Sequence, residues 1–256
     1  MLPLAIIALL TYSAFAPPFL FFLTNDEGCV QSPISWWKLN ETTGARTDSR
    51  GGNTLEVTPG LVDIASQAGV ISNAANFVAA DAERLSCAST ANLTMTNTSW
   101  SFAFWLKVQT ANIDYNLLNK VQQPGDSEYD VTLYGGTNSV AFTVWTSDIS
   151  SNIIVSTNTV QTNVWTFVAG VYNMPAQTIS ISVNNSPFHS IGSVTNSYGA
   201  VSVFSLGSAD SGAPSYLDGA MDETAVWKCA LTQEDVNFLY NGGLGRTYNP
   251  ATAHVE

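Results

Sequence analysis

The stretch LDGAMDETAVWKCALTQEDVNFLYNGG, residues 217–243, constrains the fold of this chain more than any other segment. Side chains alternate in its first half, with Met221, Thr224 and Val226 on one side and Trp227 on the other. A β-strand needs this period of two, because successive side chains of a strand point to opposite faces of its sheet. The first half of the segment therefore predicts a strand.

A short capped helix is predicted to follow this strand. Thr232 stands where an N-cap residue is expected, and Asp235 follows three positions later, close to the pattern of a capping box. One apolar helical face is made of Val236, Leu239 and Tyr240. Gly242 and Gly243 are typical of a helix end, because glycine readily adopts the left-handed backbone that closes a helix.

Length and charge limit the class of protein. A chain of 256 residues with 45% hydrophobic residues suits one large all-β domain or two small ones. The net charge is −12 and only eight residues are Lys or Arg. This composition argues against a nucleic-acid partner, because phosphate binding needs clusters of basic side chains.

The chain after Ser32 consists of short apolar alternations separated by clusters of Gly, Asn, Asp, Ser and Pro, which is typical of a β-sandwich or barrel. In SWSFAFWLKVQ, one face is made of Trp100, Phe102, Phe104 and Leu106, and the other of Ser101, Ala103, Trp105 and Lys107. The segment WTFVAGVYNMPAQTISISVNNSPF predicts a hairpin with a turn at Asn173-Met174-Pro175. Further strands are predicted at EYDVTLYG, NSVAFTVWTS and VSVFSLGS.

These segments, in this order, resemble the laminin-G-like, concanavalin A-like jelly-roll domains from Ile34 to Tyr248. WWKLNETTGARTDSRGGNTLEV resembles the family's Trp-rich first strand and glycine-rich loop, SWSFAFWLKVQ its central strand, and GAMDE with the Leu-Thr helix its end. The resemblance implies an all-β jelly-roll sandwich of two antiparallel sheets with one short C-terminal helix. It divides the chain into an apolar N-terminal segment (1–30), the jelly roll (31–248) and a C-terminal tail (249–256).

The same resemblance implies a disulfide. In the family's topology the first strand, ISWWKLN, pairs antiparallel with the last strand, MDETAVWK. Cys29 precedes the first strand and Cys229 follows the last, so the pairing brings the two cysteines together. The alternative is three unreactive thiols, with Cys87 as the third.

The N-terminal segment carries no charge from Leu2 to Leu23, and Ala14-Phe15-Ala16 resembles a signal-peptidase site. Pro17 would follow the cut, where it is poorly tolerated. Two readings stay open: an export signal or membrane anchor, and a retained hydrophobic arm that assembles a homo-oligomer. The first places the domain outside the cell, as a secreted or surface-anchored protein, and the second suits a virion-associated one.

Catalytic motifs are weak. The sequence has neither G-x-S-x-G nor H-E-x-x-H. Glycoside hydrolases of this fold class carry paired carboxylates on one strand, and Glu128 with Asp130 is the nearest pair here. The third acid that such enzymes carry is missing, because Thr132, Leu133 and Tyr134 follow. We therefore expect no enzymatic activity.

A structural calcium ion is the best inorganic candidate, because Ca²⁺ binds carboxylate and carbonyl oxygens in loops. By resemblance to relatives with a calcium ion beside the last strand, Asp222 would supply a carboxylate, and Asp48 of the glycine-rich loop would lie nearby. The alternative for Asp222 is a turn carboxylate that accepts backbone N–H groups.

Strand parity suggests a ligand face. If Val140, Phe142 and Val144 face the core, Trp145 faces outward, and the same parity turns Tyr134 and Trp105 outward. Sugar rings stack their C–H faces on such aromatic rings, so Trp105, Tyr134 and Trp145 are predicted to form one glycan-binding platform. The alternative is packing beneath loops or against the N-terminal segment.

Together these features predict a non-enzymatic extracellular binding or adhesion module that recognises carbohydrate or a surface partner. The alternative is a structural, decoration or attachment protein of a phage particle or other extracellular assembly. A glycoside hydrolase is the third hypothesis.

Overall fold

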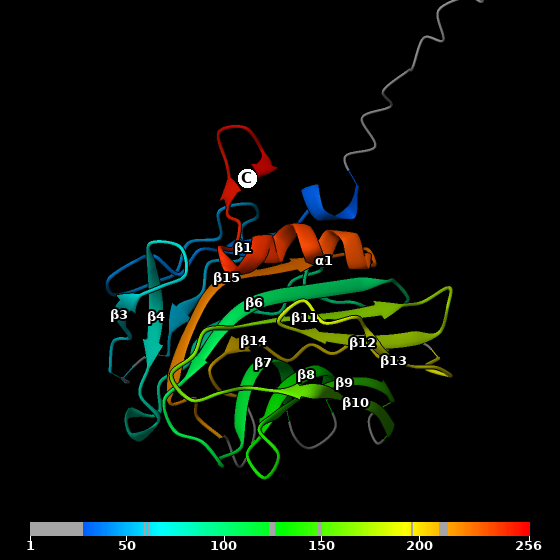
Figure 1. Cartoon of the computed structure of the whole chain (residues 1–256), viewed down its shortest axis with the longest axis horizontal. Coiled ribbons are helices and arrows are strands. Elements are labelled where there is room, and N and C mark those ends of the chain that lie inside the picture. Colours follow the sequence, from blue (N-terminus) through cyan, green and yellow to red (C-terminus); the bar gives the residue numbers. More distant parts are fainter. Residues whose placement is uncertain are drawn as a thin grey trace, which may run out of the picture.

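Two antiparallel β-sheets packed face to face make up the computed structural model, which describes residues 28–58, 60, 62–122, 126–147, 150–195, 197–209 and 215–256 (Figure 1). The eight-stranded sheet contains, in spatial order, β13 (His189–Ile191), β12 (Thr178–Val183), β11 (Thr166–Asn173), β6 (Trp100–Val108), β15 (Gly219–Trp227), β4 (Asn73–Phe77) and β3 (Ala65–Ala68), with β1 (Ser35–Trp37) also paired to β15. The seven-stranded sheet contains β10 (Ser150–Thr159), β9 (Ser139–Ser147), β8 (Asp126–Tyr134), β7 (Tyr115–Gln122), β14 (Phe204–Leu206), β5 (Leu85–Cys87) and β2 (Glu56–Val57). These sheets confirm the predicted sandwich.

Helical elements and a small hairpin complete the described fold. They are α1 (Gln233–Tyr240), the 3₁₀ turns η1 (Cys29–Gln31), η2 (Ala79–Asp81) and η3 (Asn241–Gly243), and the hairpin of β16 (Tyr248–Asn249) and β17 (His254–Val255). The hairpin contains the residues that the sequence predicted as a tail, and the side chain of Gln31 holds it, because its Oε1 accepts a hydrogen bond from the Val255 N–H at 2.7 Å.

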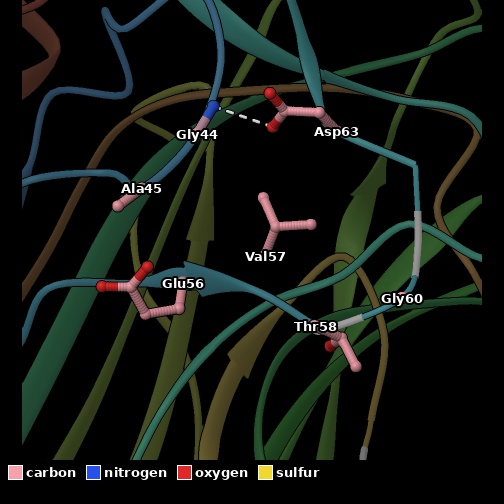
Figure 2. A pocket seen from close by; sticks show the side chains of 7 residues that line it. All are labelled: Gly44, Ala45, Glu56, Val57, Thr58, Gly60 and Asp63. Atoms are coloured by element: carbon pink, nitrogen blue, oxygen red, sulfur yellow. Dashed lines mark hydrogen bonds between the residues drawn. The ribbon is translucent and has the colours of Figure 1, made fainter.

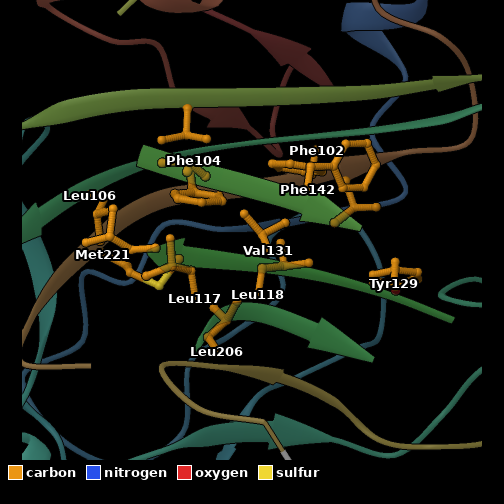
Figure 3. Close-up of a cluster of buried hydrophobic side chains, with 14 of the residues drawn as sticks. Phe102, Phe104, Leu106, Leu117, Leu118, Tyr129, Val131, Phe142, Leu206 and Met221 are labelled. Carbon is orange, nitrogen blue, oxygen red and sulfur yellow. The ribbon is translucent and has the colours of Figure 1, made fainter. Parts of the chain in front are cut away.

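Aromatic and aliphatic side chains fill the space between the two sheets. Phe102, Phe104 and Leu106 of β6 are fully buried, as their alternation predicted, and they face Val131 of β8 (Figure 3). The rings of Phe102 and Phe142 meet edge to face, with 5.0 Å between their centroids. Burying each such side chain contributes roughly 1.5–3 kcal/mol to folding, so this layer supplies most of the driving force.

A second apolar layer covers the outer face of the eight-stranded sheet. Trp36 and Trp227 pack edge to face there, with 5.9 Å between their ring centroids. Val236 and Leu239 of α1 close the layer from outside, and Figure 1 shows α1 on the side of this sheet that faces away from β7–β10. This sheet is therefore buried on both faces.

The predicted capping box of α1 is present. The Thr232 hydroxyl accepts a hydrogen bond from the Asp235 N–H at 3.1 Å, and the Asp235 carboxylate accepts one from the Thr232 N–H at 2.7 Å. The helix ends one residue earlier than the glycines suggested, because Asn241 takes the left-handed C-cap conformation (φ 48°). Asparagine tolerates this region better than most residues, since its side chain bonds locally.

The first and last strands of the sandwich pair as expected and carry the disulfide at their ends. Trp36 of β1 pairs with Ala225 of β15, and Cys29 is bonded to Cys229 with 5.8 Å between their Cα atoms. The remaining thiol, Cys87, is partly buried, and burial raises its pKa to about 12, so it is a poor nucleophile.

The signal, anchor and assembly-arm hypotheses concern residues 1–27, which lie outside the described residues. Within the described part of the chain, no helix has the length and apolar character needed to cross a bilayer.

Candidate functional site

The outward surface of three neighbouring strands combines polar, aromatic and exposed aliphatic side chains. We call it the β8–β10 face and define it by Asp130, Thr132 and Tyr134 of β8, Thr143 and Trp145 of β9, and Ile153 and Val155 of β10. The strands alternate strictly here, because Tyr129, Val131, Leu133, Phe142 and Val144 point into the core. Every second side chain therefore points to the outer side of the sheet, where Thr143 is only 4% exposed.

A row of polar residues crosses the strands of the sheet at this point. Ser205 of β14 pairs with Asn119 of β7, Asn119 with Asp130, and Asp130 with Thr143. Asn119 is fully buried, and neither its amide oxygen nor its amide nitrogen has a hydrogen-bond partner. The row therefore holds unused hydrogen-bonding capacity, which is unusual for a buried polar side chain.

Asp130 is the carboxylate of the β8–β10 face. Its Oδ1 accepts a hydrogen bond from the Thr132 hydroxyl at 3.3 Å. Burial raises its pKa, while the nearby Thr143 hydroxyl and Trp145 indole oppose that shift. The Trp145 Nε1–H lies close enough to influence Asp130 but forms no hydrogen bond of normal geometry, so this donor is also unused.

Exposed apolar side chains lie on β10, the edge strand of the same face. Ile153 and Val155 are 46% and 37% exposed, and they stand opposite Thr143 and Ala141 on the neighbouring strand. Neither residue was predicted from the sequence, although their alternation with the buried Ile154 in the segment SNIIVSTNT indicated this face. Half-buried Tyr134 and Trp145 complete the face, as predicted for these two aromatic residues.

The prediction that Trp105 belongs to the same platform is wrong. Trp105 is on β6 of the eight-stranded sheet and is only 3% exposed. Its ring stacks on Tyr240 of α1 with 5.7 Å between centroids, and it also contacts Phe167. Strand parity placed Trp105 away from the core correctly, but parity does not reveal which sheet a strand joins.

The carboxylate pair considered for a hydrolase is split. Glu128 is fully buried, and its Oε2 lies 2.6 Å from Nζ of the equally buried Lys120. Its other oxygen accepts a hydrogen bond from the Met95 N–H. Glu128 is thus a structural ion-pair partner, and only Asp130 of the pair retains exposed surface.

The two predicted metal ligands both accept backbone N–H groups. Asp48 Oδ1 accepts from Trp36, Arg50 and Gly51 at 2.9–3.0 Å, and its Oδ2 accepts from Asn53 at 3.1 Å. Four N–H donors present positive charge to this carboxylate, so Asp48 does not fit the role of a calcium ligand.

Asp222 is better suited to hold a cation. It is fully buried, its Oδ2 accepts N–H groups from Val70 and Ile71 at 2.7 and 3.0 Å, and its Oδ1 has no partner. Glu223 beside it also has one unpartnered oxygen, Oε1. No group of three or more His, Cys, Asp and Glu side chains suited to a metal occurs among the described residues.

Calcium binding at Asp222 stays a prediction. If it occurs, Ca²⁺ should raise the melting temperature by several degrees relative to an EDTA-treated sample, because a ligand that binds only the folded state stabilises it. Asp222→Asn should abolish the rise, and Asp48→Asn is the comparison. Identical melting curves with Ca²⁺ and EDTA would remove the hypothesis.

A surface pocket lies at the opposite edge of the seven-stranded sheet, beside β2. It has a volume of about 320 Å³ and is lined by Gly44, Ala45, Glu56, Val57, Thr58, Gly60 and Asp63. Figure 2 shows Val57 between the side chains of Glu56 and Asp63, and Asp63 accepts a hydrogen bond from the Gly44 N–H at 2.7 Å. No sequence pattern had pointed to this pocket. The pocket contains the Asp63 carboxylate, which is hydrogen-bonded to the Gly44 N–H, and no feature of the described residues indicates a ligand for the pocket.

The two packed antiparallel sheets define a jelly-roll sandwich, and the family comparison agrees. The chain belongs to the concanavalin A-like lectin/glucanase superfamily, whose Laminin G type 3 model matches residues 84–237, more than half of its length. A search of curated protein sequences gave no match.

Among the solved structures that this chain resembles are binding domains of a mosquitocidal protein and of botulinum neurotoxins. The binding domain of Paraclostridial Mosquitocidal Protein 1 has a TM-score of 0.67 at 13% identity, over 84% of this chain and 53% of that one. The botulinum neurotoxin serotype D ligand-binding domain in complex with N-acetylneuraminic acid has a TM-score of 0.64 at 14% identity, over 84% and 52%. At these identities the likeness shows the fold alone, and this chain spans about half the length of the chains it matches.

Proposed function

We propose that this protein is a non-enzymatic glycan-binding module that works outside the cell. The observation that carries the proposal is the β8–β10 face, where the half-buried Trp145 lies beside the Asp130 carboxylate and the exposed Ile153. Protein sites that hold sugars combine apolar surface for the C–H face of the ring with a few polar groups that fix its orientation. This face has both, on a rigid sheet.

Three further points support the proposal. The superfamily includes lectins, and a solved structure of the same fold is described in complex with N-acetylneuraminic acid. The burial of Glu128 in an ion pair removes one of the two carboxylates that a hydrolase of this fold would use. The Cys29–Cys229 disulfide is typical of proteins folded in an oxidising compartment, which supports an extracellular location.

Trp145→Ala should weaken glycan binding about tenfold or more, because losing an aromatic stacking platform costs about 1.4 kcal/mol or more. The measurement is a glycan array with the labelled domain, followed by titration calorimetry on the best oligosaccharide. Trp165→Ala is the matched control, since Trp165 is also half-buried but lies outside the β8–β10 face, with Lys107 over its ring. Unchanged affinity in a folded Trp145→Ala protein would contradict the proposal, as would an array with no binding.

A further inference from the structure

We propose that the β8–β10 face selects neutral glycans and rejects sialylated, sulfated or uronate-bearing ones. This inference rests on the proposed function and specifies its ligand class. It departs from the structural neighbour that is described with bound N-acetylneuraminic acid, an anionic sugar. The basis is the distribution of charge around the face.

The strands of the face contain no cationic side chain. Residues 126–159, which span β8, β9 and β10, include four acidic residues and no Lys, Arg or His. Residues 192–218, part of which packs against this end of the sheet, also lack Lys, Arg and His. Within this segment the Tyr198 N–H donates to the Trp145 carbonyl oxygen at 2.7 Å, and the Val201 N–H donates to Asp126 at 3.0 Å.

The cation nearest in the sheet is already neutralised. Lys120 of β7, the strand next to β8, is fully buried and paired with Glu128 at 2.6 Å. Its ammonium group also donates to the carbonyl oxygen of Ala200 and, at 3.3 Å, to the hydroxyl of Thr94. A buried, fully bonded ammonium group cannot turn outward to meet a ligand carboxylate without breaking these bonds.

The other cations are not on the strands of the β8–β10 face. Arg84 immediately precedes β5, which β14 and β7 separate from β8 in the sheet. Lys107 donates to Gln67 at 2.7 Å on the outer side of the eight-stranded sheet, and Arg246 stacks over Phe238 of α1. The remaining Lys and Arg residues are Lys38, Arg46, Arg50 and Lys228, and the two histidines are His189 of β13 and His254 of β17.

The face itself is negative. Asp130 stands at its centre, and Asp114 lies close enough to Tyr134 to act on its phenol group. Asp114 is held next to Tyr134, because its Oδ1 accepts a hydrogen bond from the Gly135 N–H at 2.7 Å. Burial first, and then the charges of Asp130 and Asp114, raise the pKa of Tyr134. An anionic ligand would therefore meet repulsion with no cation to offset it.

Neutral sugars fit the same groups well. A carboxylate is a strong acceptor for sugar hydroxyl groups, and Asp130 has no cationic partner to compete for its oxygens. Ile153 and Val155 supply exposed apolar surface, whereas the Trp145 indole N–H is buried beside Asp130 and leaves only the ring for stacking. The face thus offers a carboxylate acceptor and an apolar stacking surface to an uncharged ring.

The test is an array that carries pairs of oligosaccharides with the same core, one neutral and one sialylated or sulfated. At low salt we expect the neutral member of a bound pair to have an affinity at least about tenfold higher than that of its anionic counterpart. This affinity gap should narrow at high salt, because salt screens the repulsion. Ile153→Lys, which adds a cation next to Thr143, should narrow the gap at low salt. Val164→Lys, at a residue 46% exposed outside the face, should leave it unchanged.

The outcomes separate this inference from the proposed function. Equal or tighter binding of the anionic member, in a protein whose binding is lost in Trp145→Ala, would overturn the selectivity and leave the glycan-binding module intact. Binding that Trp145→Ala does not affect would overturn both, and so would an array without any bound oligosaccharide. A gap that Ile153→Lys fails to narrow would overturn the electrostatic explanation.

Discussion

Replacing Lys120 with Met should lower the free energy of unfolding by roughly 3–5 kcal/mol, because removing one partner of a buried ion pair leaves the other charge without compensation. In this chain the uncompensated group is the fully buried Glu128 carboxylate, which would keep only two backbone N–H donors, from Met95 and Ala200. The carbonyl oxygen of Ala200 would lose the ammonium donor as well. Urea denaturation followed by tryptophan fluorescence measures the loss.

A double-mutant cycle identifies the ion pair as the cause. Lys120→Met combined with Glu128→Gln should be more stable than Lys120→Met alone, because the neutral amide no longer carries a buried charge. Lys107→Met is the control, since Lys107 is half-buried and contacts only neutral groups in the described interactions, the Gln67 side chain and the Trp165 ring. It should change stability by about 1 kcal/mol or less. Additive effects of the two buried substitutions would show that the pair is not coupled.

This ion pair also concerns the β8–β10 face. The pair joins β7 and β8 to the segment around Ala200, and the neighbouring Tyr198 N–H is bonded to the carbonyl oxygen of Trp145. A destabilised pair should therefore loosen the support behind Trp145 before it affects Ile153, which lies on the edge strand. The ion pair therefore has a structural role. Because it is buried, Glu128, the candidate hydrolase carboxylate, has no catalytic role in our proposal.

Local patterns predicted the strands and the capped helix because each depends on a short-range rule, whereas the disulfide followed from the family resemblance, which pairs the first strand with the last. Period-two alternation alone placed Phe102 and Phe104 on one face of their strand, and the relation between Thr232 and Asp235 predicted α1. The pairing of β1 with β15 then placed Cys29 beside Cys229.

The candidate site was predicted only in part, because parity gives a side of a strand and not its sheet. Tyr134 and Trp145 were placed correctly, whereas Trp105 faces α1 on the opposite side of the sandwich. The Lys120–Glu128 pair was also missed, since a lone lysine in a strand normally extends to solvent and no local rule reports its burial. These errors concern long-range packing.

The bulge in β15 leaves two adjacent acids buried without a counter-ion bonded to either. Its register shifts between Asp222 and Ala225, and Glu223 adopts a left-handed backbone (φ 45°), which turns both acids toward the outer layer of the eight-stranded sheet. Asp222 is fully buried and Glu223 is 3% exposed. Burial raises the pKa of Asp222 to about 7, and burial together with the neighbouring Asp222 charge raises that of Glu223 to about 8.

These shifts predict that the domain becomes less stable as the pH rises toward 8. The folded state holds the two protons more tightly than the unfolded chain, in which these acids titrate near pH 4. The stabilisation by protonation is therefore complete below about pH 4 and is lost as the pH rises through the folded pKa values of about 7 and 8. A shift of about three units corresponds to roughly 4 kcal/mol per group as an upper bound.

Asp222→Asn with Glu223→Gln should remove this pH dependence, because the amides keep the shape of both side chains and never ionise. In metal-free buffer the double variant should match the wild type near pH 4 and exceed its unfolding free energy by several kcal/mol near pH 8.5. Glu234→Gln, at an exposed residue of α1, controls for the change in net charge. A stability difference between double variant and wild type that stays constant with pH would contradict the prediction.

Calcium and protons should compete for these same oxygens if Asp222 holds a cation. Asp222 Oδ1 and Glu223 Oε1 are both buried and both lack a partner, so at high pH either a cation neutralises them or the fold carries their full desolvation cost. Added Ca²⁺ should then restore stability near pH 8.5 and have little effect near pH 5, where protons already occupy the site. A Ca²⁺ effect of equal size at both pH values would place any bound cation elsewhere and leave the proton-linked bulge as the sole reason for the pH dependence.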